Sequence, residues 1–183
     1  MNQELPDYFG FFGLPITLSL DQALLRQAFL ENSRKFHPDF HTLATEEAQQ
    51  HALEMSSLNN EAYKTLSDPD KRLQYVLKYY GFLQEGMETP LPPEFLMQMM
   101  DINEKVMELE FEAAPGLYEE ASQEIAAFEQ ELEHKASAVL QTWTARDGHL
   151  DDLKIAQEYF LKKRYLLRVK ENLSKFAPAF AKS

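Results

Sequence analysis

His37, Pro38 and Asp39 follow one another in the chain, and their types and order are its clearest chemical signal. An imidazole beside a carboxylate can be drawn as a general base and its orienting group. No nucleophile, glycine-rich loop or metal set accompanies them, however, so an enzyme site is disfavoured. With His41 and His51 the pair offers metal ligands, yet this spacing fits no common zinc motif. A recognition loop and a simple break between two helices remain as interpretations of the tripeptide alone.

The segments around the tripeptide have helical periodicity, and no convincing alternating strand occurs, so we predict an all-α fold. Ser19 to Gln22 has the spacing of a capping box, which predicts the start of a helix there. Pro38 disfavours helical geometry at the residue before it, so the tripeptide should lie in a loop. The helices predicted for the first half are residues 8–14, about 20–36, 45–66 and 70–80.

The first half of the chain resembles the J-domain of DnaJ-like co-chaperones over residues 7 to about 78. The resemblance is carried by the tripeptide, by the segment Asp7–Leu14 ahead of it, and by a set of residues after it. These are Asn59, Glu61, Ala62, Tyr63, Leu66, Ser67, Asp68, Pro69, Lys71 and Arg72. It implies a hairpin of two antiparallel helices with short flanking helices and the tripeptide at its tip. It also implies that the tip contacts a DnaK-class chaperone and stimulates ATP hydrolysis by that partner, so the chain itself would not be an enzyme.

The tripeptide suits such a contact in three ways. Asp39 can accept a charge-assisted hydrogen bond from an arginine of the chaperone. His37 offers two ring nitrogens, and Pro38 fixes the turn. Phe40 departs from the basic residue that the family commonly carries after the tripeptide.

Basic residues in the preceding helix would supply a positive face for an acidic groove on the chaperone. They are Arg26, Arg34 and Lys35. At about 100° per residue Lys35 points away from the other two, which favours Arg26 and Arg34 as contacts.

A proline-rich linker precedes the second half, with Pro90, Pro92 and Pro93 close together. We predict a J-domain over residues 1–82, a linker over 83–93 and a C-terminal three-helix bundle over 94–183. The predicted helices of the bundle are about 94–113, 116–145 and 150–176. Residues 81–133 hold 1 basic and 14 acidic residues, which indicates either a solvated face or a docking surface for a basic partner.

The first helix of the bundle carries two apolar strips. Phe95, Met99, Ile102, Val106, Leu109 and Ala113 point within about 40° of one direction and make a sufficient core stripe. A second strip lies about 100° to 200° away and comprises Leu96, Met97, Met100, Met107 and Phe111. The last helix repeats the pattern: its core stripe is Ile155, Tyr159, Leu166, Val169, Leu173 and Phe176, and its second strip is Leu153, Ala156, Phe160 and Leu167. A second strip is either buried against the J-domain or exposed as a patch that binds another protein.

The order and length of the whole chain resemble HscB/Jac-type co-chaperones of iron–sulfur cluster assembly. The resemblance implies that the bundle binds an iron–sulfur cluster scaffold protein (IscU-like) and delivers it to a DnaK-class chaperone (HscA-like). The positions that match the family's client contact are Leu96, Met97, Met100, Asp101, Glu104, Glu108 and Phe160. The alternative is a J-domain co-chaperone for a different client, with the acidic helix as a general docking face.

Composition limits the remaining possibilities. The absence of cysteine among 183 residues excludes disulfides, thiolate metal sites and covalent holding of a cluster, and we expect no cofactor. The net charge of −12 makes nucleic acid a poor candidate partner. No run of about eighteen apolar residues occurs, so no membrane partner is expected. The acidic segment Met1–Asp7 lacks the basic start of a signal peptide, so we expect a cytoplasmic protein.

Overall fold

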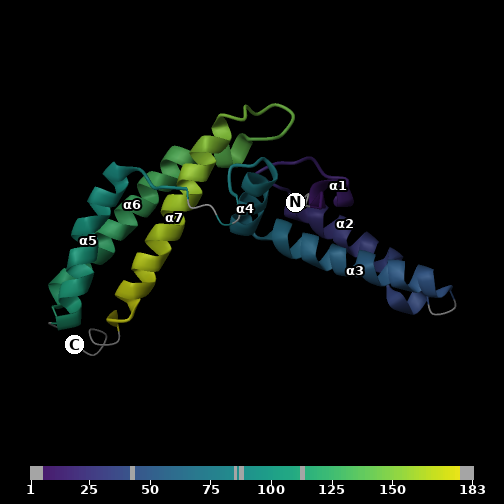
Figure 1. Ribbon diagram of the computed structural model, residues 1–183, viewed down its shortest axis with the longest axis horizontal. Coiled ribbons are helices and arrows are strands. Elements are labelled where there is room, and N and C mark those ends of the chain that lie inside the picture. The colour runs from purple at the N-terminus through teal and green to yellow at the C-terminus, as the bar shows by residue number, and fades with distance from the viewer. Residues whose placement is uncertain (1–5, 42–43, 85, 87–88, 112–113, 178–183) are drawn as a thin grey trace. The chain divides into compact units, whose positions relative to one another are not determined.

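The computed structural model describes residues 6–41, 44–84, 86, 89–111 and 114–177. Within these ranges the fold is helical, with one isolated β-bridge between Thr17 and Thr144. The elements are α1 (Tyr8–Phe12), α2 (Gln22–Lys35), η1 (Pro38–His41), α3 (Glu46–Ser67), α4 (Pro69–Tyr79), α5 (Pro93–Phe111), α6 (Pro115–Thr142) and α7 (Asp152–Ser174) (Figure 1). The prediction of an all-α fold is confirmed, and η1 is a short 3₁₀ turn where we predicted a loop.

The chain forms two compact units. Unit 1 contains the residues up to Phe82 together with Val139–Leu153, and unit 2 contains Leu83–Ala138 and the residues from Lys154 onward. Val139–Leu153 therefore packs with unit 1, although we assigned it to the bundle from the sequence. The extent of the domains as independently folding units stays a prediction.

The start of α2 differs from the capping box that we predicted at Ser19. The N-cap is Asp21, whose Oδ1 accepts from the backbone N–H groups of Ala23 at 2.8 Å and Leu24 at 3.4 Å. Ser19 instead donates its own backbone N–H to Oγ1 of Thr17 at 3.1 Å. An aspartate immediately before the first turn is an equally good N-cap. Ser19 therefore does not cap the helix and hydrogen-bonds within the preceding loop instead.

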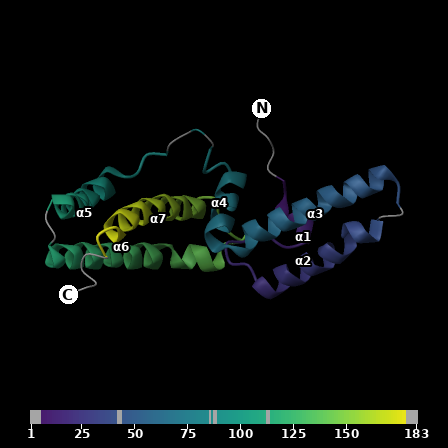
Figure 2. The ribbon, with the colours of Figure 1, turned by 90° about the horizontal axis from the view of Figure 1, so that it is seen from below.

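Helices α2 and α3 form an antiparallel hairpin and run side by side (Figure 2). The rings of Phe29 and Tyr63 stack across it with centroids 4.3 Å apart. The buried amide of Asn59 donates to the backbone O of Phe29 at 3.2 Å and to Oγ of Ser33 at 3.0 Å. A side-chain amide that bonds to the backbone of the facing helix fixes the register of the pair, which in turn fixes the position of its tip.

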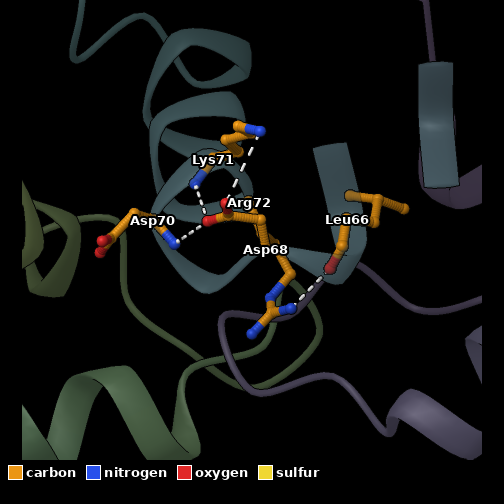
Figure 3. A network of polar contacts seen from close by, with 5 residues as sticks. All are labelled: Leu66, Asp68, Asp70, Lys71 and Arg72. Carbon is orange, nitrogen blue, oxygen red and sulfur yellow. Dashed lines mark hydrogen bonds and ion pairs between the residues drawn. The ribbon is translucent and has the colours of Figure 1, made fainter. Parts of the chain in front are cut away.

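Arg72 ties α4 to the end of α3 (Figure 3). Its Nη1 donates to the backbone O of Leu66 at 2.6 Å, and its Nε donates to the backbone O of Leu18 at 3.1 Å. Burial lowers the pKa of this guanidinium from its ordinary value. Asp68 caps α4 by accepting from the backbone of Lys71 at 3.1 Å, and this hydrogen bond lowers the pKa of the carboxyl. The family motif residues in this turn therefore hold two helices and a loop together.

The loop between α6 and α7 completes unit 1. Trp143 is 2% exposed, and its backbone O accepts from Oγ1 of Thr17 at 3.0 Å and from the N–H of Leu18 at 3.2 Å. Its ring meets the edge of the Tyr80 ring with centroids 5.5 Å apart. A Cβ at Gly148 would lie 2.5 Å from the indole, so only glycine fits without a shift. A segment far along the chain is thus part of the core beside α4.

Helices α5, α6 and α7 build unit 2. The side chains buried in it are Phe95, Met99, Ile102, Val106, Leu109, Ala121, Ile125, Leu132, Ala136, Ala156, Tyr159, Phe160, Leu166, Val169 and Leu173. Lys105 of α5 pairs with Glu124 of α6 at 2.5 Å, and Lys170 of α7 pairs with Glu129 of α6 at 2.7 Å. The two ion pairs border the core that the helices share.

Candidate functional site

The first candidate site is the tip of the α2–α3 hairpin. Helix α2 ends at Lys35, and the chain turns through η1, where the N–H of Phe40 donates to the backbone O of His37 at 3.0 Å. The side chains of His37 and Asp39 are 52% and 84% exposed, with Nδ1 and Oδ2 3.7 Å apart. The tripeptide is therefore a structured turn that presents an imidazole and a carboxylate to solvent.

A backbone hydrogen bond assigns the two ring nitrogens of His37. The N–H of Asp39 donates to Nδ1 at 3.2 Å, so Nδ1 is an acceptor in the neutral imidazole and the proton lies on Nε2. The tip can thus offer an N–H donor from His37 and a carboxylate acceptor from Asp39 to the same partner. This pair of complementary groups suits recognition of a polar surface.

Phe40 adds an apolar group to the tip. Its side chain is 74% exposed, and its ring meets the imidazole of His37 edge-on with centroids 5.7 Å apart. The position where the resemblance leads us to expect a basic residue therefore carries an aromatic contact beside the tripeptide here.

The basic residues predicted as the positive face are exposed on α2. They are Arg26, Arg34 and Lys35. The ammonium of Lys35 lies 5.0 Å from the centroid of the Phe36 ring, so it is partly engaged by its neighbour. Arg26 and Arg34 project from the same helix that carries the tip, and their role in chaperone contact stays a prediction.

The second candidate site is the outer face of α5. The predicted core stripe is buried over Phe95, Met99, Ile102, Val106 and Leu109, as the sequence analysis predicted, while Ala113 lies outside the described residues. The second strip is exposed along its whole length: Leu96 is 40% exposed, Met97 68%, Met100 59%, Met107 60% and Phe111 87%. A row of exposed large apolar side chains on one helix is typical of a protein-binding surface.

Carboxylates accompany this apolar row. Asp101, Glu104 and Glu108 are exposed on the same helix. Toward the end of α5 a shallow hollow is lined by Glu104, Met107, Glu108 and Phe111. The surface thus combines flexible apolar side chains with negative charge, which suits a partner that carries both apolar and basic groups.

Helix α7 departs from the sequence prediction at its start. Phe160 is only 6% exposed and Ile155 is 44% exposed, although we expected Ile155 in the core and allowed Phe160 to be exposed. Leu153 and Ala156 are buried on the same face as Phe160, while Leu167 of that strip is 42% exposed. The buried face of α7 therefore rotates along the helix, from Leu153, Ala156 and Phe160 to Leu166, Val169 and Leu173. Of the two alternatives that the sequence left open for Phe160, the structure shows the buried one, and its part in client binding stays a prediction.

One contact at this site has no clear signal in the sequence. Nδ2 of Asn103 on α5 donates to the phenol oxygen of Tyr165 on α7 at 2.9 Å. The Tyr165 ring also meets the edge of the Phe95 ring, with centroids 5.6 Å apart. The sequence hints at this contact only by placing a polar residue beside the core stripe of each helix, Asn103 on α5 and Tyr165 on α7.

Two other kinds of feature are absent from the ranges that the structure describes. No group of three His, Cys, Asp or Glu side chains there is arranged to hold a metal ion. None of the helices in those ranges carries an apolar run long enough to cross a membrane.

The antiparallel hairpin with its exposed His-Pro-Asp tip defines a J-domain protein, and residues 7–75 match the family model of the DnaJ domain. Residues 91–174 match a second model, described as the HSCB C-terminal oligomerisation domain. The chain belongs to the HscB family of J-domain co-chaperones, as its similarity to individual members also shows.

Three relatives illustrate this similarity. The iron-sulfur cluster co-chaperone protein HscB of Homo sapiens is 30% identical over 168 residues, which cover 91% of this chain and 67% of that protein. A co-chaperone protein HscB homolog of Vibrio cholerae is 37% identical over 101 residues, and the match spans 55% of this chain and 59% of that relative. The solved structure of chaperone HscB from Vibrio cholerae superimposes with a TM-score of 0.67 at 25% identity, covering 95% of this chain and 99% of that one.

Proposed function

We propose that this chain is an adaptor that binds an iron–sulfur cluster scaffold protein, delivers it to a DnaK-class (HscA-like) chaperone and stimulates the ATPase of that chaperone. The chain would thereby aid the maturation of iron–sulfur proteins without catalysing a reaction itself. The observation that supports this most is the presence of two different exposed recognition surfaces, one on each unit. The tip carries a polar donor and acceptor, and α5 carries an apolar row with carboxylates.

The two surfaces suit different partners. His37, Asp39 and the exposed arginines of α2 would contact polar and acidic groups of the chaperone. Leu96, Met97 and Met100 would supply apolar contact area to the client, and the carboxylates of α5 would orient a basic client. Phe160 is buried, so it would affect client binding indirectly, through the packing of α7. The human relative's name, which refers to iron–sulfur clusters, favours a scaffold protein over another client.

Turnover of ATP by a purified HscA-like chaperone tests the proposal. The rate is measured alone, with this chain, with an apo IscU-like scaffold protein, and with both. We expect this chain to raise the rate, and the pair to raise it by more than the product of their separate effects. Stimulation by this chain without any added effect of the scaffold would favour the alternative, a co-chaperone for a different client. No stimulation under any condition would contradict both.

A further inference from the structure

The exposed apolar row of α5 borders α7 along the hydrogen bond between Asn103 and Tyr165. Residues three or four positions apart are neighbours on a helix surface. Met100 and Met107 therefore lie on either side of Asn103, and Arg168 lies one turn beyond Tyr165. The candidate docking surface thus has a second edge on α7 at Arg168, a residue that was not part of the predicted client contact.

Arg168 is held at this edge by an aromatic ring. Its guanidinium carbon lies 5.7 Å from the centroid of the Tyr165 ring, within the range of a cation–π contact, while its side chain is exposed. The same Tyr165 accepts the hydrogen bond from Asn103 that joins the two helices. An arginine laid on a ring that is itself fixed loses little freedom when its planar fork binds a carboxylate.

Four lysines of the bundle are held in ion pairs with glutamates. Lysines of α5, α6 and α7 each contact a glutamate: Lys105 with Glu124, Lys135 with Glu131, Lys162 with Glu158, and Lys170 with Glu129. In the part of unit 2 that the structure describes, no carboxylate pairs with Arg168, and no cation pairs with Glu104 or Glu108. The apolar row therefore has an unpaired negative edge on α5 and an unpaired positive charge toward α7.

We propose that Arg168 forms the cationic edge of the client-docking surface and binds a carboxylate of the client. This inference rests on the proposed function and specifies the chemistry of its partner. The client surface carries apolar side chains at its centre, a basic residue facing Glu104 and Glu108, and an acidic residue facing Arg168. Two opposite charges on opposite sides of an apolar row allow only one orientation of the client, because the reversed orientation places like charges together.

Binding of a purified apo IscU-like scaffold protein, measured by calorimetry at about 0.1 M salt, tests this role. Arg168→Gln should weaken binding at least about tenfold, and Arg168→Lys should fall between that variant and the unchanged chain, because lysine keeps the charge but not the bidentate fork. Lys170→Gln is the matched control, since it removes the same charge from the same helix at a residue already paired with Glu129. That control should change the affinity less than about twofold. All three variants should keep the melting temperature, because the altered side chains are exposed.

A charge swap identifies the partner group. Arg168→Glu should lose binding, and replacing one acidic residue of the scaffold surface by Arg should restore most of it. Equal affinity of Arg168→Gln and the unchanged chain would overturn the inference, and a simultaneous loss of binding by Leu96→Ala/Met100→Ala would show that the proposed function itself stands. Absence of scaffold binding by the unchanged chain would overturn both. A fall in self-association of Arg168→Gln in sedimentation, with scaffold affinity unchanged, would assign the surface to a second copy of this chain and also overturn it.

Discussion

The backbone N–H of Asp39 donates a hydrogen bond of 3.2 Å to Nδ1 of His37. This bond orients the imidazole so that, in the neutral ring, Nε2 is the nitrogen that can donate, and the carboxylate of Asp39 beside it is 84% exposed. The tip is therefore preorganised as a donor and an acceptor before any partner arrives. Preorganisation reduces the ordering cost of binding, so small changes at these two residues should have large effects on the contact.

His37→Ala and Asp39→Ala should each abolish stimulation of the chaperone ATPase while leaving the melting temperature within about 2 °C of the unchanged chain, because exposed polar side chains contribute little to the core. His51→Ala is the control, since His51 is exposed on α3 away from the tripeptide. Retained stimulation by either tip variant, with a normal melting curve, would exclude the tripeptide as the contact.

Arg26→Ala and Arg34→Ala should weaken stimulation more at about 0.05 M than at about 0.3 M salt, since screening already suppresses an exposed ionic contact at the higher concentration. Lys64→Ala removes an exposed cation from α3 and should have no such effect. The quantity to measure is the chain concentration that gives half-maximal stimulation. Losses that do not depend on salt would argue against an electrostatic role.

Trp143→Ala should lower the free energy of unfolding by about 3–5 kcal/mol, because it empties a buried site in unit 1, removes the ring contact with Tyr80 and removes the hydrogen bond from the indole Nε1 to the backbone O of His149. Urea denaturation followed by circular dichroism measures this, with exposed Thr142→Ala as the control. A fragment of residues 1–82 lacks Trp143 as well. We therefore expect this fragment to be less stable than the whole chain, although it should still stimulate basal ATP hydrolysis by the chaperone. An unchanged unfolding curve for Trp143→Ala would contradict its place in the core.

Leu96→Ala/Met100→Ala should leave folding nearly intact and weaken client binding by tens of fold, because hot-spot truncations at interfaces cost about 2 kcal/mol or more. Met99→Ala is the contrasting variant: Met99 is fully buried on the same helix, so its truncation should destabilise the chain by about 2–5 kcal/mol. Phe160→Ala should resemble Met99→Ala, since Phe160 is 6% exposed. Strong destabilisation by the Leu96 and Met100 changes would instead place these residues in a core.

Stability should fall as the pH rises from about 10 to 12. Burial raises the pKa of Tyr75 and of Tyr8 to about 12, so between these values the folded state binds protons that the unfolded state has released. This stabilisation is complete below pH 10 and is lost as the pH rises through the folded pKa. Tyr75→Phe should flatten the decline in melting temperature across this window, and an unchanged decline would show that other groups cause it.

Residue type and spacing within single segments predicted much of the fold and of the candidate site on α5. The tripeptide with its flanking helices, the four helices of the first half and the core stripe from Phe95 to Leu109 follow from residue type and spacing within one segment. Helical periodicity is a property of the chain itself, so it identifies the face of α5 that must be buried. The start of α2 was missed by one or two residues because Ser19 and Asp21 both satisfy local capping rules, and only their three-dimensional surroundings select one of them.

Tertiary structure decided what lies next to each face. The second strips of α5 and α7 look alike in sequence, yet Met100 is 59% exposed and Phe160 is 6% exposed. Periodicity states which side chains share a direction, whereas burial depends on which other segments occupy that direction. The same reason explains the pairing of Thr17 with Trp143 and of Asn103 with Tyr165, which join residues 126 and 62 positions apart. Such contacts form only after helices assembled from local signals pack together, and the second of them joins α5 to Tyr165, the ring on which Arg168 lies.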